Sequence, residues 1–242
     1  MPDIHCYGCG GTYGNQIMHA FAQGCGGEFH DKALPRFHGG TTVVWGLARG
    51  APGLVENSDD WYYVDHAYLR RGHTTGYYRV TRNGHQQTWI RDVPPDRWEK
   101  LGVKLEKRKG GDQVILVPPS PVVRAVFGVY WEPPKGIESR KDGKPFHEKF
   151  PRAKVVYTYN SIAAVEAIVH GIPAVVTGES AAAPVSSQSV EEPTFPDDDL
   201  RTRWAHSLAY GQFTLDEMRS GLAWSIASMS AGTSAKSCRG TS

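Results

Sequence analysis

The sequence lacks any long uninterrupted run of hydrophobic residues. No apolar stretch approaches the roughly 20 residues of a membrane-spanning helix, and no signal peptide is recognisable, so we expect no membrane partner. The chain also lacks a strong net charge of either sign. The 27 Lys and Arg face 25 Asp and Glu, which permits a polyanionic partner but does not require one. The 242 residues, 40% hydrophobic and 21% charged, indicate a globular protein of one large or two small domains.

Cysteine is also scarce. The four cysteines are Cys6, Cys9, Cys25 and Cys238. The pair Cys6-x-x-Cys9 is typical of zinc and redox sites. Further ligands could come from His5, His19, Cys25 and His30. A second pair of this kind is absent, however, and a glycine-rich loop instead of a helix follows the first. We therefore expect reduced thiols and no metal at the site, with a metal as the lesser alternative.

The clearest pattern in the chain covers residues 153–178. Val155–Thr158 is a short apolar strand, and Ala174–Thr177 is a second one. Between them, apolar residues recur at helical spacing, at Ile162, Val165, Ile168 and Val169. Gly171 and Pro173 then end the helix. A strand, a helix and a strand in this order predict a parallel sheet.

Polar residues stand where this strand meets this helix. Asn160 and Ser161 are good N-cap residues, and the backbone N–H groups at such a position attract phosphate. Glu166, further along the helix, can accept hydrogen bonds from a ribose diol if it faces a crevice. The alternative is that Ser161 only caps the helix and Glu166 is a solvated side chain.

The residues Asn160-Ser161-x4-Glu166-Ala167, followed by Gly171-Ile172-Pro173-Ala174, resemble the donor-binding half of glycosyltransferases with two Rossmann-like domains, the GT-B architecture. They also resemble sugar-nucleotide epimerases of that architecture and capsule-polysaccharide enzymes. In those families the helix N-terminus meets the nucleotide diphosphate, and a glutamate on the helix holds the ribose. The resemblance implies the first role for Ser161, with Asn160 beside it, and the second role for Glu166.

A first strand, Ile4–Tyr7, leads into a glycine-rich loop, Gly8–Asn15, and then into a short apolar helix. This order is the entry of a Rossmann-like half, although the loop lacks the usual Gly-x-Gly-x-x-Gly pattern of dinucleotide sites. In the resembled families this loop touches the donor phosphates or the acceptor; the alternative is a flexible connection. The implied donor contacts are Gly10, Gly11, Thr12 and Gly14. The resemblance also places Ser120, after a strand at Val114–Val117, near the donor phosphates.

The strand Trp61–Tyr68 ends in the polar pair Asp65-His66. Catalytic groups are common at the exit of a strand in open α/β sheets. We predict that Asp65 acts as the general base on an acceptor hydroxyl and that His66 assists it. The alternative is that Asp65 caps the next turn and His66 is simply exposed.

Arginines, aromatic residues and side-chain amides alternate over residues 70–89. Arginine binds phosphate in a bidentate manner and aromatic rings stack on unpaired bases, so we predict an acceptor or DNA-binding surface. Its residues are Arg70, Arg71, Tyr78, Arg79, Arg82, Asn83 and Gln86. The segments Tyr63–Tyr68 and Tyr78–Asn83 resemble bacteriophage proteins linked to DNA-base modification. The alternative is an ordinary basic surface hairpin.

These patterns predict an α/β fold with two small Rossmann-like domains facing a cleft, as in GT-B, and C-terminal helices that pack back on the sheets. The expected domains are 1–110 on the acceptor side and 111–227 on the donor side, followed by a disordered tail at 228–242. A break near Gly211 and a capping box at Thr214 divide the C-terminal helices. One departure from the resembled architecture is the short helix after Ser120. Arg140-Lys141 could be the remnant of a basic phosphate contact.

The predicted function is transfer of a sugar from a nucleotide sugar, with a UDP-sugar as first choice, to a hydroxyl acceptor. The preferred acceptor is a 5-hydroxymethylated pyrimidine, such as hydroxymethylcytosine, in double-stranded phage DNA. No tightly bound cofactor is expected, although Mg²⁺ can assist. The alternatives are a glycosyltransferase or epimerase acting on a polysaccharide or sugar nucleotide, and a non-catalytic DNA-binding accessory protein. The expected location is the cytoplasm, that of the host if a phage encodes the chain.

Overall fold

The computed structural model describes residues 3–31, 36–47, 50–72, 75–134 and 151–229. Contacts between Cα atoms divide the chain into two compact units. Unit 1 comprises the described parts of residues 1–65, 73–85 and 213–242, and unit 2 comprises those of residues 66–72 and 86–212. This division differs from the expected one at residue 110, because residues 86–110 belong to unit 2 and the chain returns to unit 1 at Phe213.

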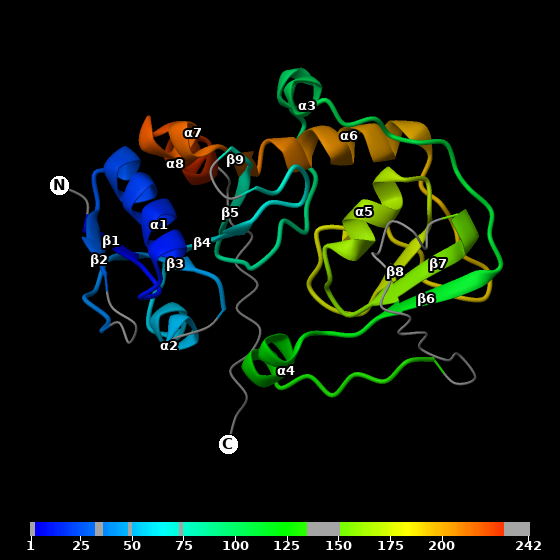
Figure 1. Cartoon of the computed structure of the whole chain (residues 1–242), viewed down its shortest axis with the longest axis horizontal. Coiled ribbons are helices and arrows are strands. Elements are labelled where there is room, and N and C mark those ends of the chain that lie inside the picture. Colours follow the sequence, from blue (N-terminus) through cyan, green and yellow to red (C-terminus); the bar gives the residue numbers. More distant parts are fainter. Residues whose placement is uncertain (1–2, 32–35, 48–49, 73–74, 135–150, 230–242) are drawn as a thin grey trace. The chain divides into compact units, whose positions relative to one another are not determined.

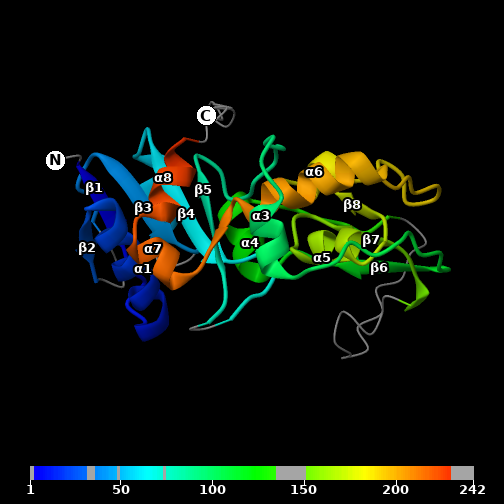
Figure 2. The same ribbon diagram turned by 90° about the horizontal axis from the view of Figure 1, so that it is seen from above.

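Unit 1 is built on a sheet with the strand order β2-β1-β3-β4-β5-β9, and Figure 2 shows β1, β3, β4 and β5 side by side. β1 pairs in parallel with β2 on one side and β3 on the other, and β3 pairs in parallel with β4. The winding therefore reverses between β1 and β3, where open α/β sheets bind ligands. The strands are β1 Ile4–Tyr7, β2 Glu28–His30, β3 Thr41–Trp45, β4 Trp61–His66, β5 Tyr78–Arg82 and β9 Gln212–Phe213.

Helices cover both faces of this sheet (Figure 1). The larger core cluster lies on the side of α1, and it includes Cys6 of β1. The second cluster lies on the side of α2, and it includes Tyr7. Alternation of side chains along a strand explains why these neighbours enter different clusters. The helices of unit 1 are α1 Thr12–Cys25, α2 Ala51–Glu56, α7 Leu215–Arg219 and α8 Leu222–Ser228.

Unit 2 contains three parallel strands in the order β6-β7-β8, and α5 connects β7 to β8 as the sequence predicts. Gly171 follows α5 with a φ of 80°, and a Cβ there would lie 2.0 Å from the Lys107 carbonyl oxygen, so this turn requires glycine. The strands are β6 Gln113–Val117, β7 Ala153–Thr158 and β8 Ala174–Val176. The helices are α3 Asp96–Leu101, α4 Pro121–Phe127, α5 Ala163–Val169, the 3-10 helix η2 Ala183–Val185 and α6 Asp198–Ala209.

The predicted α/β class with parallel sheets is confirmed. The capping box at Thr214 is present, and the helices it introduces pack in the larger core of unit 1. Of the expected tail, Ser228 ends α8, and residues 230–242 lie outside the described part of the chain, as does Arg140-Lys141. In the described ranges no helix combines the length and hydropathy needed to cross a bilayer.

Candidate functional site

A pocket of about 520 Å³ lies beside α5 in unit 2. Its walls are the turn after β4, the segment after α3 and one side of α5. Backbone hydrogen bonds join the last two walls. Glu106 N donates to Val169 O at 2.9 Å, and Lys109 N donates to Gly171 O at 2.8 Å. The lining residues with a charged or imidazole side chain are Arg70, Arg71, Lys104, Glu106, Glu166 and His170.

Arg71 and Glu166 form an ion pair at this pocket. The Arg71 side chain is 43% exposed and that of Glu166 is 30% exposed, so separating them costs about 1 kcal/mol or less. The sequence assigns Arg71 to the acceptor and Glu166 to the donor, and the structure brings them together in one unit. A guanidinium beside a carboxylate can bind a phosphate with the first group and a sugar hydroxyl with the second.

His170 and Glu106 form a second pair at the same pocket. His170 Nδ1 lies 2.7 Å from Glu106 Oε1, and Lys109 also bonds to this carboxylate. The Lys109 hydrogen bond, followed by that of His170, lowers the pKa of Glu106 and keeps it anionic at neutral pH. The pocket therefore pairs each of its carboxylates with a basic group.

Arg70 has a structural role at the rim of the pocket. Its backbone has a positive φ of 54°, and its guanidinium donates to Leu101 O at 3.0 Å and to Gly102 O at 2.9 Å. These bonds satisfy carbonyl groups at the C-terminal end of α3. The Arg70 guanidinium is thus bound to backbone carbonyls, whereas the Arg71 guanidinium is paired with a carboxylate. A ligand can displace that carboxylate from Arg71.

The predicted diphosphate site is the N-terminal turn of α5, a helix of 7 residues. Two of the N–H groups there already donate within the turn. Ser161 N donates to Thr158 Oγ1 at 3.3 Å, and Ala163 N donates to Ser161 Oγ at 3.2 Å. Ile162, rather than Asn160 or Ser161, is the N-cap residue. The hydroxyl of Ser161 therefore serves its own turn.

Ser120 and Asn160 lie at the ends of neighbouring strands, after β6 and β7 respectively. The Ser120 hydroxyl caps α4 by accepting from Val123 N at 3.2 Å. The Asn160 carbonyl accepts from Gln86 Nε2 at 3.0 Å. Both residues stand at the carboxyl edge of the second sheet, as predicted, and both already have partners in unit 2.

The glycine-rich loop follows β1, but α1 begins inside it, at Thr12. Gly10 has a positive φ of 68°, and Gly11 is the N-cap residue, which has no side-chain bond. A Cβ on Gly14 would lie 2.5 Å from Cys9 Sγ. These four predicted donor residues belong to unit 1, whereas Ser120, Asn160, Ser161 and Glu166 belong to unit 2. Gly10 and Thr12 also line a pocket of about 740 Å³ in unit 1.

Asp65 belongs to a compact polar cluster in unit 1. Its Oδ2 accepts from the Tyr63 hydroxyl at 2.6 Å and from the Arg79 guanidinium at 2.9 Å. Burial, followed by the charge of Asp65, raises the pKa of Tyr63. His85 packs edge-on against Tyr63, and burial lowers the pKa of His85 to about 4. Asp65 thus anchors a buried arginine, and His66, the next residue, is exposed.

The remaining residues of the predicted acceptor surface bond within their own unit. Tyr78 is fully buried, and Gln86 is 8% exposed. Their partners are Tyr13 for Tyr78, Asp60 for Arg82, the Trp61 N–H for Asn83, and Asn160 and Ala181 for Gln86. These contacts hold the elements of each unit together. Contact between these residues and an acceptor remains a prediction.

Three pocket residues in unit 2 with a charged or imidazole side chain are absent from the sequence-based prediction. They are Lys104, Glu106 and His170. Lys104 and Glu106 lie in a charged segment that is typical of a linker, and His170 follows the last turn of α5. His170 and Glu106 are 64 residues apart in the chain. No local spacing therefore indicates that they meet.

No family model matches the sequence, and no curated protein matches it. Among solved structures, the beta Kdo 2,7 transferase KpsC of Thermosulfurimonas dismutans overlaps with 95% of this chain and 100% of that chain. The sequence identity is 11% and the TM-score is 0.46. Similarity at this level carries no conclusion about activity, and the α/β fold rests on the sheet topology of the chain itself.

Proposed function

We propose that the chain is a glycosyltransferase that uses a nucleotide-sugar donor and binds the nucleotide in the pocket of unit 2. The observation that carries this proposal is the ion pair of Arg71 with Glu166, because Glu166 lies on α5 in the segment that resembles a donor-binding half. The pocket volume of about 520 Å³ falls in the range of ligand sites. Its basic groups suit a diphosphate, and its carboxylates suit the hydroxyls of a ribose.

The donor replaces the internal ion pair with two contacts of its own. The ribose diol donates to the Glu166 carboxylate, and Arg71 turns to the diphosphate, with Lys104 adding a second positive charge. As the bond between the sugar and the diphosphate breaks, negative charge grows on the leaving phosphate. Cations placed beside that phosphate stabilise the transition state more than the ground state.

The acceptor supplies a hydroxyl whose proton a carboxylate removes. Asp65 is the proposed base, and the hydrogen bonds that its Oδ2 accepts from Tyr63 and Arg79 hold the carboxylate in one orientation. The proposed acceptor class remains a hydroxymethylated pyrimidine in double-stranded DNA. Because Arg79 and Arg82 form internal ion pairs, saccharide acceptors must be tested beside the DNA.

The first experiment is a donor screen by thermal shift with UDP, GDP, CMP and their sugars, each with and without Mg²⁺. One nucleotide class should stabilise the chain, by about 2.7 kcal/mol at a hundred times its dissociation constant. Arg71→Met and Glu166→Gln should each weaken that binding by about tenfold or more, because each removes a charged hydrogen bond.

The matched control is another arginine–carboxylate ion pair in unit 2. Arg203 and Asp199 form an exposed pair along α6, with no part in the pocket. Arg203→Met and Asp199→Asn should leave nucleotide binding unchanged. A chain that responds to none of the nucleotides, or pocket variants that bind as tightly as the natural chain, would overturn the proposal.

A further inference from the structure

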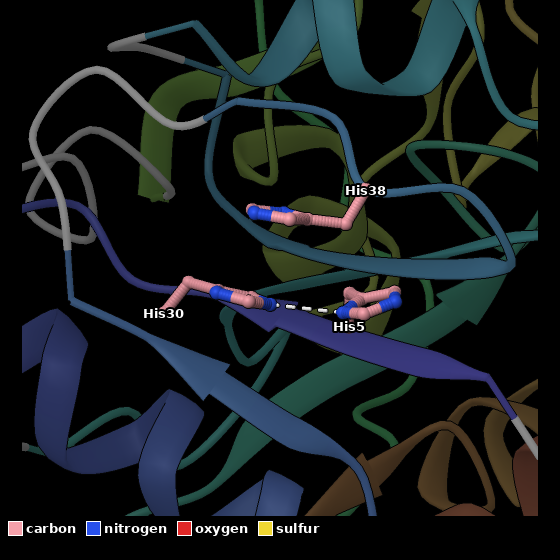
Figure 3. A group of neighbouring side chains, drawn as sticks. All are labelled: His5, His30 and His38. Atoms are coloured by element: carbon pink, nitrogen blue, oxygen red, sulfur yellow. Dashed lines mark hydrogen bonds between the residues drawn. The ribbon is translucent and has the colours of Figure 1, made fainter.

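Three histidine side chains converge on one face of the sheet in unit 1 (Figure 3). They are His5 in β1, His30 at the end of β2 and His38 in the segment before β3. One ring nitrogen from each lies within 4.8 Å of the other two, and His5 Nδ1 is 2.9 Å from His30 Nε2. We propose that this cluster binds a divalent transition-metal ion of the zinc class. The inference does not rest on the proposed function.

The register of two strands produces most of the cluster. β1 and β2 pair in parallel, with His5 opposite Glu28 and Tyr7 opposite His30, so these four side chains share one face. A Glu28 oxygen lies 3.6 Å from His5 Nδ1 and 3.9 Å from His30 Nε2. Imidazoles and a carboxylate are the ligand types that zinc accepts in tetrahedral sites. Glu28 can therefore supply the fourth ligand, or leave that position to water.

His38 reaches the cluster from outside the strands, and Tyr7 holds it there. The His38 N–H donates to the Tyr7 hydroxyl at 3.0 Å, and His38 Nδ1 lies 3.1 Å from the same hydroxyl. With Nδ1 bound to the tyrosine, Nε2 is the nitrogen left for a metal. A hydrogen bond from the second ring nitrogen to a fixed group is a common feature of metal-binding histidines.

Asp3 fixes the His5 ring in the same way as Tyr7 fixes His38. Asp3 Oδ1 lies 2.6 Å from His5 Nε2. The carboxylate favours a proton on Nε2, and this leaves the lone pair on Nδ1, the nitrogen that faces His30. The His5 ring is buried, whereas the Asp3 and Glu28 side chains are largely exposed. An ion can therefore reach the cluster from solvent.

The distances allow a bound ion after a modest side-chain rearrangement. Zinc–nitrogen bonds of about 2.0–2.1 Å place tetrahedral ligand atoms about 3.3 Å apart. The present separations, from 2.9 Å up to 4.8 Å, lie on both sides of that value. His38 stacks on His30 with ring centroids 4.2 Å apart and an angle of 5° between the planes. Because lone pairs lie in the ring plane, one ring must rotate. His38 is exposed and has the space to do so, and its backbone N–H keeps its bond to the Tyr7 hydroxyl when the ring turns.

The cysteine motif is not part of this site. Cys6 packs in the core on the opposite face of β1, with its Sγ 3.8 Å from Cys25 Sγ. The sequence places His5 and His30 among the alternative ligands of a cysteine site, whereas the structure joins them to His38. The proposed metal therefore has nitrogen and oxygen ligands and ties the segment before β3 to the edge of the sheet.

The test uses the full chain, stripped of metal with EDTA and titrated with Zn²⁺ against a chromophoric chelator. We expect about one ion per chain, and a visible absorption spectrum typical of tetrahedral Co²⁺ when cobalt replaces zinc. Asp3→Asn should weaken Zn²⁺ binding by about tenfold, the effect typical of an outer-shell carboxylate. His38→Ala should weaken it more than Asp3→Asn does.

His38→Ala is the decisive variant, because His38 is exposed and its loss should not disturb folding, which circular dichroism checks. The matched control is His19→Ala, an exposed histidine on α1 that touches Phe29 and is not in the cluster. This control should bind Zn²⁺ like the natural chain. The proposal is overturned if the natural chain binds no Zn²⁺, if His38→Ala binds it as tightly, or if His19→Ala loses as much affinity.

Discussion

Arg79 and Arg82 lie three positions apart on β5, and their ion pairs differ in burial. The Arg79 side chain is 6% exposed and pairs with Asp65, whereas Arg82 is 29% exposed and pairs with Asp60. Asp65→Asn removes the negative charge that faces a buried guanidinium and should lower the free energy of unfolding by about 3 kcal/mol. Asp60→Asn should lower it by about 1 kcal/mol or less. Urea denaturation of both variants measures the difference.

Equal losses in the two variants would contradict this argument from burial. The same Asp65→Asn variant also tests the catalytic role. If it folds at the assay temperature and keeps full turnover, Asp65 is not the general base. Its stability loss must therefore be measured before its activity is interpreted.

His85 makes stability depend on pH. Burial, followed by the positive charge of Arg79, lowers its pKa from 6.5 to about 4 in the folded chain. Between these two values the unfolded chain binds a proton that the folded chain does not, so stability falls as the pH drops from about 6.5 to about 4. The full effect is on the order of 3 kcal/mol, at 1.36 kcal/mol per pKa unit.

Denaturation at a series of pH values, for the natural chain and His85→Gln, isolates this contribution. The variant should lose less stability than the natural chain between pH 6.5 and pH 4. Identical pH profiles would show that His85 is protonated as readily in the folded chain as in the unfolded one.

Single residues also show where prediction from sequence ends. The strand–helix–strand unit that contains Ser161 and Glu166 can be predicted from the sequence, because apolar periodicity is a local property. The partner of Glu166 is 95 residues away, and nothing in the sequence around Arg71 specifies it. The alternation of arginine and aromatic residues on β5 is typical of an exposed hairpin. Arg79 nevertheless lies inside, because Asp65 offsets its charge there.

At the level of elements, two helical glycines lie in opposite surroundings. A Cβ on Gly24 of α1 would lie 1.9 Å from the Met218 carbonyl oxygen of α7, whereas a Cβ on Gly53 of α2 would meet nothing within 4 Å. Alanine gains about 1 kcal/mol over glycine in a helix interior. Gly53→Ala should therefore raise stability by up to that amount. Gly24→Ala must push α7 away and should lower stability by about 2 kcal/mol or more.

Thermal denaturation of these two variants gives opposite shifts if this packing is correct. A stabilising Gly24→Ala would mean that α1 and α7 do not pack as closely as described. Each variant is the control for the other, because both make the same chemical change inside a helix.

The elements that the sequence predicts well are those with strong local signals. β1 and β6 lie within a residue, at each end, of the predicted strands Ile4–Tyr7 and Val114–Val117, and the capping box at Thr214 opens α7. The glycine-rich loop is shorter than predicted, because α1 tolerates Gly14 in its first turn against Cys9 and Trp45. The sequence does not predict α2, since its Ala51-Pro-Gly53 start has weak helix propensity and its stability comes from packing on the sheet.

At the scale of the whole molecule, neither unit is a continuous stretch of chain. Unit 1 takes its C-terminal residues from beyond position 212, and unit 2 includes residues 66–72. Composition cannot reveal this, because a glycine-containing charged segment such as 92–112 has the appearance of a linker. In the structure it contains α3 and belongs to unit 2.

A fragment of residues 1–110 should not fold cooperatively. It lacks Phe213 and Met218, which are 0% and 1% exposed in the core of unit 1, and each contributes about 1.5–3 kcal/mol when buried. It also lacks Ala223 and Ala227 of α8, which fill the same core. Against a total stability of about 5–15 kcal/mol, these losses are decisive.

The comparison is a chain in which residues 1–85 are joined to residues 213–242 by a glycine–serine linker. This chain restores the core of unit 1 and should show a cooperative urea transition, whereas the fragment 1–110 should show a broad one and bind a hydrophobic dye. A cooperative transition in the fragment 1–110 would mean that α7 and α8 are dispensable for the core. The linear division at residue 110 would then describe the folding unit better than the interleaved one.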